Sequence, residues 1–296
     1  MKPMLLSNDE FNLEDLDYTN MYISIKRDGV RAEITNEGIK NRSLKILRNK
    51  KVQDRFRSVF ETLPDGMILE AEIYSESLPC RIIAGICNSD DKDVPEDLKL
   101  YVFGIYHPHL DFEDRYEMLK DLMMNKENDL WEMVVQTKIN SKEDAMKLYS
   151  FYLDHGYEGA VLMDGWKKYK EGRVTINQHI GFKLKPHRTD DLEIIGVTER
   201  FLNTNESQTN ELGRSFKRNT VDAKESTGIA ATFICRMESG EETKVTITGE
   251  ESVRREIWKN KETYIGRCAE VLSMDYGTKD KLRHPRLIKV KMKVEK

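Results

Sequence analysis

The sequence predicts an α+β domain followed by an all-β barrel. The chain has 296 residues, which is long for one hydrophobic core and suits two domains. Strand-like and helix-like stretches alternate up to residue 187, whereas strand-like stretches dominate after Pro186. We therefore expect two domains, at residues 1–187 and 188–296.

In the first domain, apolar residues recur at helical spacing in four segments: 52–63, 82–86, 116–123 and 144–152. Strands are predicted where apolar, β-branched and aromatic residues cluster: 21–25, 67–74, 100–107, 159–163 and 180–186. Pro64-Asp65-Gly66 ends the first helix, and Ser141 is a favourable residue to begin the last one. We expect antiparallel sheets with flanking helices.

The second domain has strand-like patterns at 191–201, 230–237, 243–249, 264–277 and in the basic C-terminal segment, with a short helix near 250–260. About five strands in about 105 residues predict a small barrel, and the five-stranded OB-fold matches that number. Periodicity alone also allows an SH3-like barrel or a sandwich.

Composition excludes several classes of protein. Apolar residues make up 39% of the chain, and none of their runs approaches the ~20 residues of a membrane span. The start, MKPMLLSNDE, becomes acidic too early for a secretory signal, and the four cysteines form no CxxC pair. We expect a cytoplasmic, monomeric protein without an evident protein partner.

Charge is distributed unevenly along the chain. Net charge is −4, so any binding of nucleic acid must depend on local basic patches. Residues 276–296 carry eight Lys and Arg against two acidic residues, and apolar residues alternate with the basic ones. This pattern is typical of a strand with one basic face, although a solvated charged face is equally compatible with it.

One strand ends in a way that burial does not explain. MYISI at 21–25 reads as a buried strand and runs directly into Lys26-Arg27-Asp28-Gly29. Asp-Gly is a strong turn signal, so a solvated hairpin is the simple interpretation. The alternative is that Lys26 is a nucleophile held at the end of a fixed strand.

Later motifs support the nucleophile. Asn41-Arg42-Ser43 marks a turn, and Glu70-Ala71-Glu72 places two glutamates on the same face of an apolar strand. Glu158 precedes another strand, and Lys183-Leu184-Lys185 again puts two like charges on one face. Together these charges predict one site for a polyanion and a metal.

In order, the motifs IKRDGVR, NRS, LEAEIY, YVFGIY, EGAVLM and GFKLKP resemble the six motifs of the covalent nucleotidyltransferases, which include ATP-dependent DNA ligases, RNA ligases and mRNA capping enzymes. The chain looks most like the small viral or phage DNA ligases. The resemblance implies an adenylation domain followed by an OB-fold domain. It also implies ATP as cofactor, Mg²⁺ or Mn²⁺, and nicked duplex DNA as substrate.

The resemblance implies a role for each matching residue. Lys26 looks like the nucleophile that forms lysyl-AMP, with Phe103 stacked on the purine. Contacts to the nucleotide are implied for Ser24, Ile25, Arg31, Arg42, Glu72, Lys183 and Lys185, and metal binding for Glu158 and Glu70. Arg42 also looks like a contact of the 5′-phosphate of the nick.

Elementary chemistry agrees with these roles. A lysine must lose its proton before it attacks, and neighbouring cations with partial desolvation favour the neutral amine. Phosphoryl transfer needs positive charge around the phosphate oxygens, which Lys183, Lys185 and a metal supply. Carboxylates are the ligands that Mg²⁺ and Mn²⁺ prefer.

The chain departs from the family pattern at its end. Arg283-His284-Pro285-Arg286 matches the lead-in to the last motif, but the motif itself then falls on Lys291-Met292-Lys293 and lacks the acid. We expect Lys291 and Lys293 to act as a general cationic clamp, because lysine is a point charge where arginine binds bidentately.

The predicted function is an ATP-dependent DNA ligase that seals 3′-OH/5′-phosphate nicks in DNA replication, repair and recombination. The alternatives are an RNA ligase or a capping guanylyltransferase and, more remotely, a non-catalytic nucleic-acid-binding protein. The polar segment 202–228 is either a surface loop or a contact for duplex phosphates. DNA contacts are predicted at Arg42, Arg214, Lys217, Arg218, Arg283 and Arg286.

Overall fold

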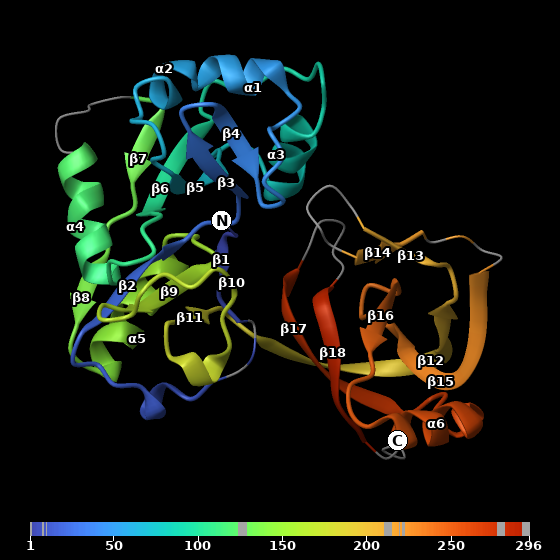
Figure 1. Ribbon diagram of the computed structural model, residues 1–296. Coiled ribbons are helices and arrows are strands. Elements are labelled where there is room, and N and C mark those ends of the chain that lie inside the picture. Colours follow the sequence, from blue (N-terminus) through green and yellow to red (C-terminus); the bar gives the residue numbers. More distant parts are fainter. Residues whose placement is uncertain are drawn as a thin grey trace. The chain divides into compact units, whose positions relative to one another are not determined.

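The computed structural model describes residues 2–7, 9, 11–123, 129–209, 215–218, 220, 223–276 and 282–291. The chain divides into two compact units, Met1–Lys185 and Pro186–Lys296. The first unit contains two sheets with helices, and the second is built around a barrel (Figure 1). The predicted α+β class with a following all-β domain is confirmed.

The larger sheet of the first unit has five strands in the order β4 (Gly38–Asn41), β3 (Val30–Thr35), β5 (Leu69–Tyr74), β6 (Lys99–Ile105) and β7 (Trp131–Met133). The smaller sheet has the order β11 (Gly181–Leu184), β9 (Gly159–Asp164), β2 (Met21–Lys26) and β8 (Thr137–Ile139). Apart from the β6–β7 pair, neighbouring strands in both sheets are antiparallel. A short parallel pair joins β1 (Met4–Leu5) to β10 (Gly172–Arg173).

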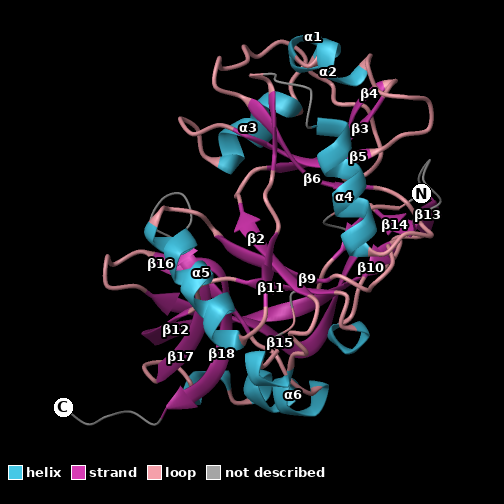
Figure 2. Cartoon of the chain, turned by 90° about the vertical axis from the view of Figure 1, so that its left-hand side faces the viewer, coloured by secondary structure: helices cyan, strands magenta, loops and turns pink. Residues whose placement is uncertain are grey.

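Helices cover the outer faces of these sheets (Figures 1 and 2). They are α1 (Lys50–Arg55), α2 (Arg57–Phe60), α3 (Cys80–Cys87), α4 (Phe112–Met123) and α5 (Lys142–Asp154), with 3₁₀ turns at Leu13–Asp15 and Ile176–Gln178. The first four pack on the five-stranded sheet through a core that includes fully buried Val52, Phe56 and Ile83. α5 packs on the four-stranded sheet through Ala145 and Tyr152.

The single helix predicted over 52–63 is two short helices instead. Phe56 lies between them with φ −100° and ψ 10°, outside the helical region. Its side chain is fully buried. Packing of this aromatic ring therefore outweighs the continuous helical periodicity.

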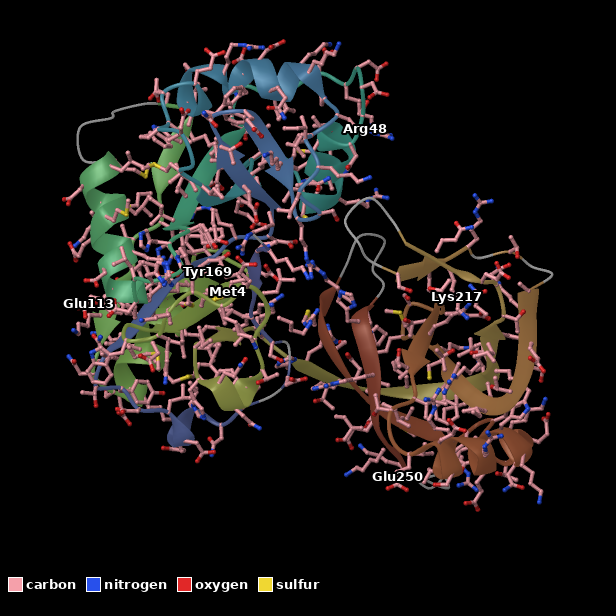
Figure 3. All side chains as sticks on the ribbon, in the orientation of Figure 1. Met4, Arg48, Glu113, Tyr169, Lys217 and Glu250 are labelled. Atoms are coloured by element: carbon pink, nitrogen blue, oxygen red, sulfur yellow. The ribbon has the colours of Figure 1, made fainter. Side chains whose placement is uncertain are left out.

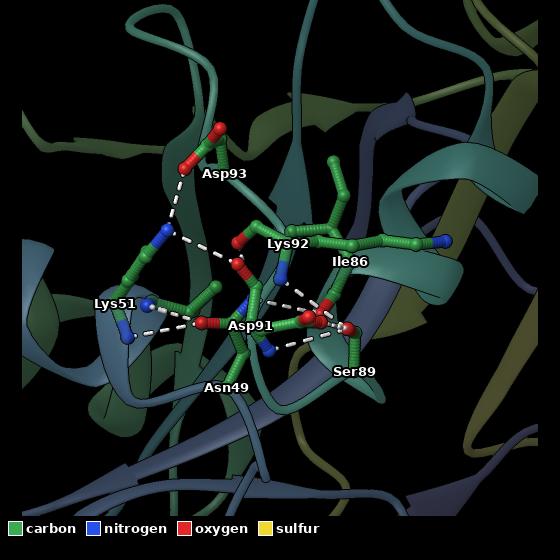
Figure 4. Close-up of polar contacts among 8 residues, drawn as sticks. Asn49, Lys51, Ile86, Ser89, Asp91, Lys92 and Asp93 are labelled. Carbon is green, nitrogen blue, oxygen red and sulfur yellow. Dashed lines mark hydrogen bonds and ion pairs between the residues drawn. The ribbon is translucent and has the colours of Figure 1, made fainter.

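A polar cluster holds α1 against the segment that follows α3 (Figure 4). The Asn49 side chain caps α1 by accepting from the backbone N–H of Lys51 at 2.9 Å, and its amide donates to the carbonyls of Ile86 (3.0 Å) and Lys92 (2.9 Å). Lys51 also forms an ion pair with Asp93 at 2.5 Å. One fully buried side chain thus fixes two helices and a loop.

The second unit is a closed five-stranded barrel in the order β12 (Arg188–Asn203), β15 (Lys224–Arg236), β16 (Glu242–Thr246), β18 (Leu282–Lys291) and β17 (Cys268–Tyr276). α6 (Glu251–Lys259) and a 3₁₀ turn at Lys261–Thr263 connect β16 to β17. Fully buried Ile194, Phe233 and Val271 fill its core. The predicted OB-fold barrel is confirmed, whereas an SH3-like barrel or a sandwich does not describe it.

The polar segment 202–228 is more regular than predicted. β12 and β15 extend into it, and between them lies a hairpin of β13 (Ser207–Thr209) and β14 (Ser215–Lys217). Side-chain amides of Asn203 and Asn205 both donate to the carbonyl of Arg218, at 2.7 and 2.6 Å.

No helix within the described residues is long and apolar enough to cross a membrane.

Candidate active site

A cavity of about 600 Å³ lies between the two sheets of the first unit. Its volume is in the range of cofactor and small-molecule sites. Side chains from both sheets line it, together with residues 4–6, the turn at 41–43 and α3. The chain thus brings segments distant in sequence to one concave surface.

Lys26 lies at the C-terminal end of β2 and lines this cavity. Met21 to Ser24 are buried, and β2 is hydrogen-bonded between β9 and β8, so the backbone before Lys26 is fixed. The predicted position of the lysine at the end of a buried strand is confirmed. Its amine is therefore delivered to the cavity by a rigid element.

The amine of Lys26 forms an ion pair with Glu158, and the amine of Lys185 lies 2.5 Å from the other oxygen of the same carboxylate. The backbone N–H of Glu158 donates to the carbonyl of Lys26 at 3.0 Å. Gly159 follows with φ 149°, and a Cβ there would lie 2.1 Å from the carbonyl oxygen of Leu184. Only glycine lets the backbone after Glu158 approach Leu184 this closely.

The bend after Lys26 also depends on glycine. A Cβ on Gly29 would lie 2.4 Å from the carbonyl oxygen of Ile73 in β5. Beside it, the guanidinium of Arg27 lies 3.6 Å from the ring centroid of Tyr101, a close cation–π contact. No role for Arg27 is predicted from sequence. Its stacking fixes the residue next to Lys26.

Arg31 belongs to a network that links the two sheets. It contacts the carboxylate of Glu70, to which the hydroxyl of Tyr169 also donates at 2.7 Å. Tyr169 accepts in turn from the backbone N–H of Met4 at 2.8 Å, and Figure 3 shows these two residues together. The guanidinium of Arg31 lies 4.6 Å from the ring centroid of Phe103. Glu70 is thus a partner of Arg31 in this structure.

Glu72 lines the same cavity. In the antiparallel pairing of β5 with β3 it lies opposite Arg31. Burial raises its pKa to about 7, although nearby Lys26 and Arg31 act in the opposite direction. The carboxyl group is therefore partly protonated near neutral pH. It can donate a hydrogen bond to a ligand as well as accept one.

Lys183 lines the cavity and donates to the carbonyl of Leu6 at 2.9 Å. Burial, together with the positive charges of Lys185, Lys26, Arg173 and Arg42, lowers the pKa of its amine to about 8. Several positive charges close together in a partly buried cavity repel one another, which is unfavourable without an anion. It becomes favourable when an anion such as a phosphate chain binds.

The cavity collects most of the predicted site residues of the first unit: Ile25, Lys26, Arg31, Arg42, Glu70, Glu72, Phe103, Lys183 and Lys185. Ser24 is buried and is not among the residues that line the cavity. The exposed side chain of Arg42 follows Asn41, whose side-chain oxygen accepts from the backbone N–H of Ser43 at 2.8 Å.

Carboxylates of the described residues form no cluster of three potential metal ligands. Mg²⁺ usually binds one or two carboxylates together with substrate phosphates, so a larger cluster is not required. Both predicted ligands already have partners, since Glu70 accepts from Arg31 and Tyr169 and Glu158 contacts the amines of Lys26 and Lys185. With a nucleotide bound, Glu158 would hold such a metal and the metal would neutralise phosphate charge.

The predicted DNA contacts of the second unit lie on the hairpin and on β18. Lys217 and Arg218 are exposed, and Arg283 and Arg286 are half-buried on β18. Lys291 forms ion pairs with Asp191 (2.7 Å) and Glu270 (2.9 Å), and these carboxylates raise its pKa. Arg214 and Lys293 lie outside the described residues.

Sequence reasoning missed the contribution of the N-terminal segment and of Tyr169. The carbonyls of Met4 and Leu6 accept from Arg31 and Lys183, and β1 itself has only two residues. A two-residue strand has no periodicity to detect. The one sequence feature that marks this segment is the apolar pair Leu5-Leu6 close to polar residues.

A two-sheet domain whose cationic cavity contains a strand-end lysine, followed by an OB-fold barrel, defines a nucleotidyltransferase architecture. The family model "ATP dependent DNA ligase domain" matches residues 3–180. The chain therefore belongs to the family of ATP-dependent DNA ligase domains. This match favours a DNA ligase over the RNA ligase and capping enzyme alternatives.

Two relatives are DNA ligases of African swine fever virus. The protein of isolate Pig/Kenya/KEN-50/1950 is 23% identical over 193 residues, covering 62% of this chain and 46% of the relative. That of isolate Warthog/Namibia/Wart80/1980 is 22% identical over 191 residues, covering 61% and 45%. The chain thus spans about half the length of these relatives.

Solved structures with the same fold include Chlorella virus DNA ligase-adenylate, with a TM-score of 0.56 and 22% identity over 99% of both chains. A Lig E DNA ligase aligns with a TM-score of 0.73 and 15% identity over 98% of this chain and all of the other. At these identities the likeness establishes the fold alone.

Proposed function

We propose that this protein is an ATP-dependent DNA ligase that seals nicks between a 3′-OH and a 5′-phosphate through a lysyl-AMP intermediate on Lys26. The observation that carries the proposal is the delivery of Lys26 into a cavity rich in cations, within a chain of the ATP-dependent DNA ligase domain family. ATP, a divalent metal and nicked duplex DNA are its proposed ligands.

In the first step the neutral amine of Lys26 attacks the α-phosphorus of ATP, a P–N bond forms, and pyrophosphate leaves. The amine of Lys26 forms an ion pair with Glu158. Release of that ion pair and loss of a proton must precede attack. Lys183 and Lys185 lie on the same wall and would stabilise charge on the phosphate oxygens.

In the second step the 5′-phosphate of the nick attacks the lysyl-AMP phosphorus, and Lys26 leaves as the amine. In the third step the 3′-OH attacks the 5′-phosphorus and AMP leaves. Arg42 is the exposed cation of the cavity and so is the proposed contact for the 5′-phosphate. Each step exchanges one bond to phosphorus for another and consumes no redox equivalents.

The test is incubation with α-labelled ATP or GTP and Mg²⁺, followed by a denaturing gel. We expect label from ATP on the wild type and none on Lys26→Ala. Lys147→Ala removes an exposed lysine of α5 and should label normally. Label that survives Lys26→Ala would exclude this lysine, and label from GTP would indicate a capping enzyme. Addition of nicked DNA or nicked RNA to the labelled protein separates the substrates.

We also propose that the hairpin holds duplex phosphates through Lys217 and Arg218. Both are exposed, and hydrogen bonds from Asn203 and Asn205 fix the base of the hairpin. Phosphate contacts of this kind set affinity without reading sequence.

Reversal of both hairpin charges to Glu should weaken nick binding and lower the salt slope of log K by about 2, one for each lost phosphate contact. The charge-matched control is reversal of Lys244 and Lys259, which are exposed on β16 and α6. Equal effects of the two double variants would show that net charge alone matters, and would overturn a role for the hairpin.

A further inference from the structure

Gln136 is a buried polar residue of the cavity wall that the proposed chemistry does not use. It lies immediately before β8, lines the cavity and is 7% exposed. No sequence motif singles it out. Its side-chain hydrogen bonds nevertheless set it apart from its neighbours.

Only one of the two polar atoms of the Gln136 side-chain amide has a hydrogen-bond partner among the described residues. Its Nε2 donates to the carbonyl of Phe103 at 3.4 Å, and its backbone N–H donates to the hydroxyl of Tyr116 at 3.0 Å. The oxygen Oε1 is enclosed and has no hydrogen-bond partner among the described residues. A buried acceptor without a partner costs free energy in the unliganded protein, so a group that donates to it would be bound favourably.

The position of Gln136 relates it to both sheets. Ile23 of β2 pairs with Thr137 of β8, so Gln136 lies next to Ser24 at the point where that pairing ends. Its hydrogen bond to the Phe103 carbonyl joins it to β6 of the other sheet. Gln136 therefore lies at the seam between the sheets, on the strand pair that delivers Lys26.

The surroundings suit the edge of a planar base. Phe103 lines the cavity from β6, and Val161, which pairs with Ser24, lines it from β9. An aromatic ring and an aliphatic side chain are typical surfaces for the two faces of a purine. Phe103, Val161 and Gln136 thus line one cavity.

The orientation of the Gln136 side-chain amide decides which edge of a purine base it can bind. With Nε2 directed at the Phe103 carbonyl, rotation of the amide by 180° would place two acceptor oxygens against each other. The side-chain atom that lacks a partner is therefore an acceptor oxygen. Adenine carries a donor amino group at position 6, whereas guanine carries an acceptor oxygen there.

We propose that Gln136 selects adenine nucleotides by accepting a hydrogen bond from the 6-amino group and by opposing the 6-oxo group of guanine. This inference rests on the proposed function, because it assumes that the cavity binds a purine nucleotide next to Lys26. It adds a specificity-determining residue and a physical reason for the use of ATP. A site that must satisfy a buried polar group rejects analogues that lack the matching donor.

The test is equilibrium binding by titration calorimetry to Lys26→Ala, in which no covalent step interferes. Three nucleotides are compared: ATP, purine riboside triphosphate, which has hydrogen at position 6, and inosine triphosphate, which has oxygen there. With Gln136 present we expect removal of the amino group to weaken binding about tenfold, and the 6-oxo group to weaken it further.

In Gln136→Met, which keeps the length of the side chain without its polar group, the three affinities should fall within about threefold of each other. The matched control is Gln53→Met. Gln53 is a half-buried glutamine outside the cavity whose side chain bonds both the N–H and the carbonyl of Ile39. This control should lower stability and leave the ratio of affinities unchanged.

Loss of discrimination in Gln136→Met but not in Gln53→Met supports the proposal. Equal affinity of the Lys26→Ala protein for ATP and purine riboside triphosphate overturns it, and that result does not depend on whether Gln136→Met folds. Failure of the proposed function is distinct, because it would appear as absence of ATP binding or of ATP labelling on Lys26 in the wild type.

Discussion

The ionisation of Lys183 provides a quantitative test of how the cavity is built. Its pKa falls from the ordinary 10.5 to about 8, and each unit corresponds to about 1.36 kcal/mol. Charged Lys183 therefore lowers the free energy of unfolding by about 3 kcal/mol at neutral pH. Lys183→Met removes that charge and loses one hydrogen bond to Leu6, which contributes about 1 kcal/mol. We expect the variant to be more stable than the wild type by about 2 kcal/mol at pH 7.

The sign of the pH dependence follows from linkage. Because the pKa of Lys183 is lower in the folded state, the unfolded state binds the proton more tightly between about pH 8 and 10.5. Over this window the wild type regains stability as pH rises. The advantage of Lys183→Met should therefore shrink above pH 8 and disappear near pH ~10.

Urea unfolding at pH 7 and at pH ~10 measures both quantities, and urea leaves the charges unscreened. Lys185→Met is the control, because Lys185 forms an ion pair with Glu158 at 2.5 Å and its loss should destabilise the protein at pH 7. The reasoning is refuted if Lys183→Met gains no stability at pH 7. It is refuted equally if its gain stays constant with pH.

Three further predictions concern residues of the first unit. Burial and the neighbouring Glu70 raise the pKa of Glu33 to about 7, so Glu33→Gln should gain about 3 kcal/mol over the wild type at pH 8 and lose most of that gain toward pH ~5. Urea unfolding would measure the gain, and a gain that is unchanged at the lower pH would contradict this. Gly159→Ala should lower the free energy of unfolding by about 3 kcal/mol, because its Cβ would overlap the backbone of a neighbouring strand; an unchanged urea midpoint would rule out the clash. Glu158→Gln should destabilise the protein by about 2 kcal/mol at low salt and less at high salt, because the amines of Lys26 and Lys185 lose their shared carboxylate. A loss of stability that does not depend on salt would indicate a packing defect instead.

Local patterns predicted the elements that carry the site. The buried strand before Lys26 and the paired charges of Glu70 with Glu72 are visible in consecutive residues, because side chains alternate across a strand. The pair Glu70 and Glu72 and the pair Lys183 and Lys185 both line the cavity, because alternate residues of a strand lie on the same face. The five-strand count similarly predicted the barrel of the second unit.

Contacts between distant segments were not predictable in this way. The carbonyl of Leu6 reaches Lys183, and Tyr169 joins Glu70 to Met4, across more than 90 residues in each case. Such contacts depend on how two sheets pack. No spacing rule within one strand contains that information.

Glu158 illustrates why a role assigned to a residue type needs geometry as well. The resemblance implied a metal ligand at this position, yet the two oxygens of Glu158 contact the amines of Lys26 and Lys185. A carboxylate held between two lysines compensates their charges until a polyanion arrives, and binding of that anion would release the carboxylate for a metal. One residue can thus stabilise the empty cavity and take part in the proposed chemistry.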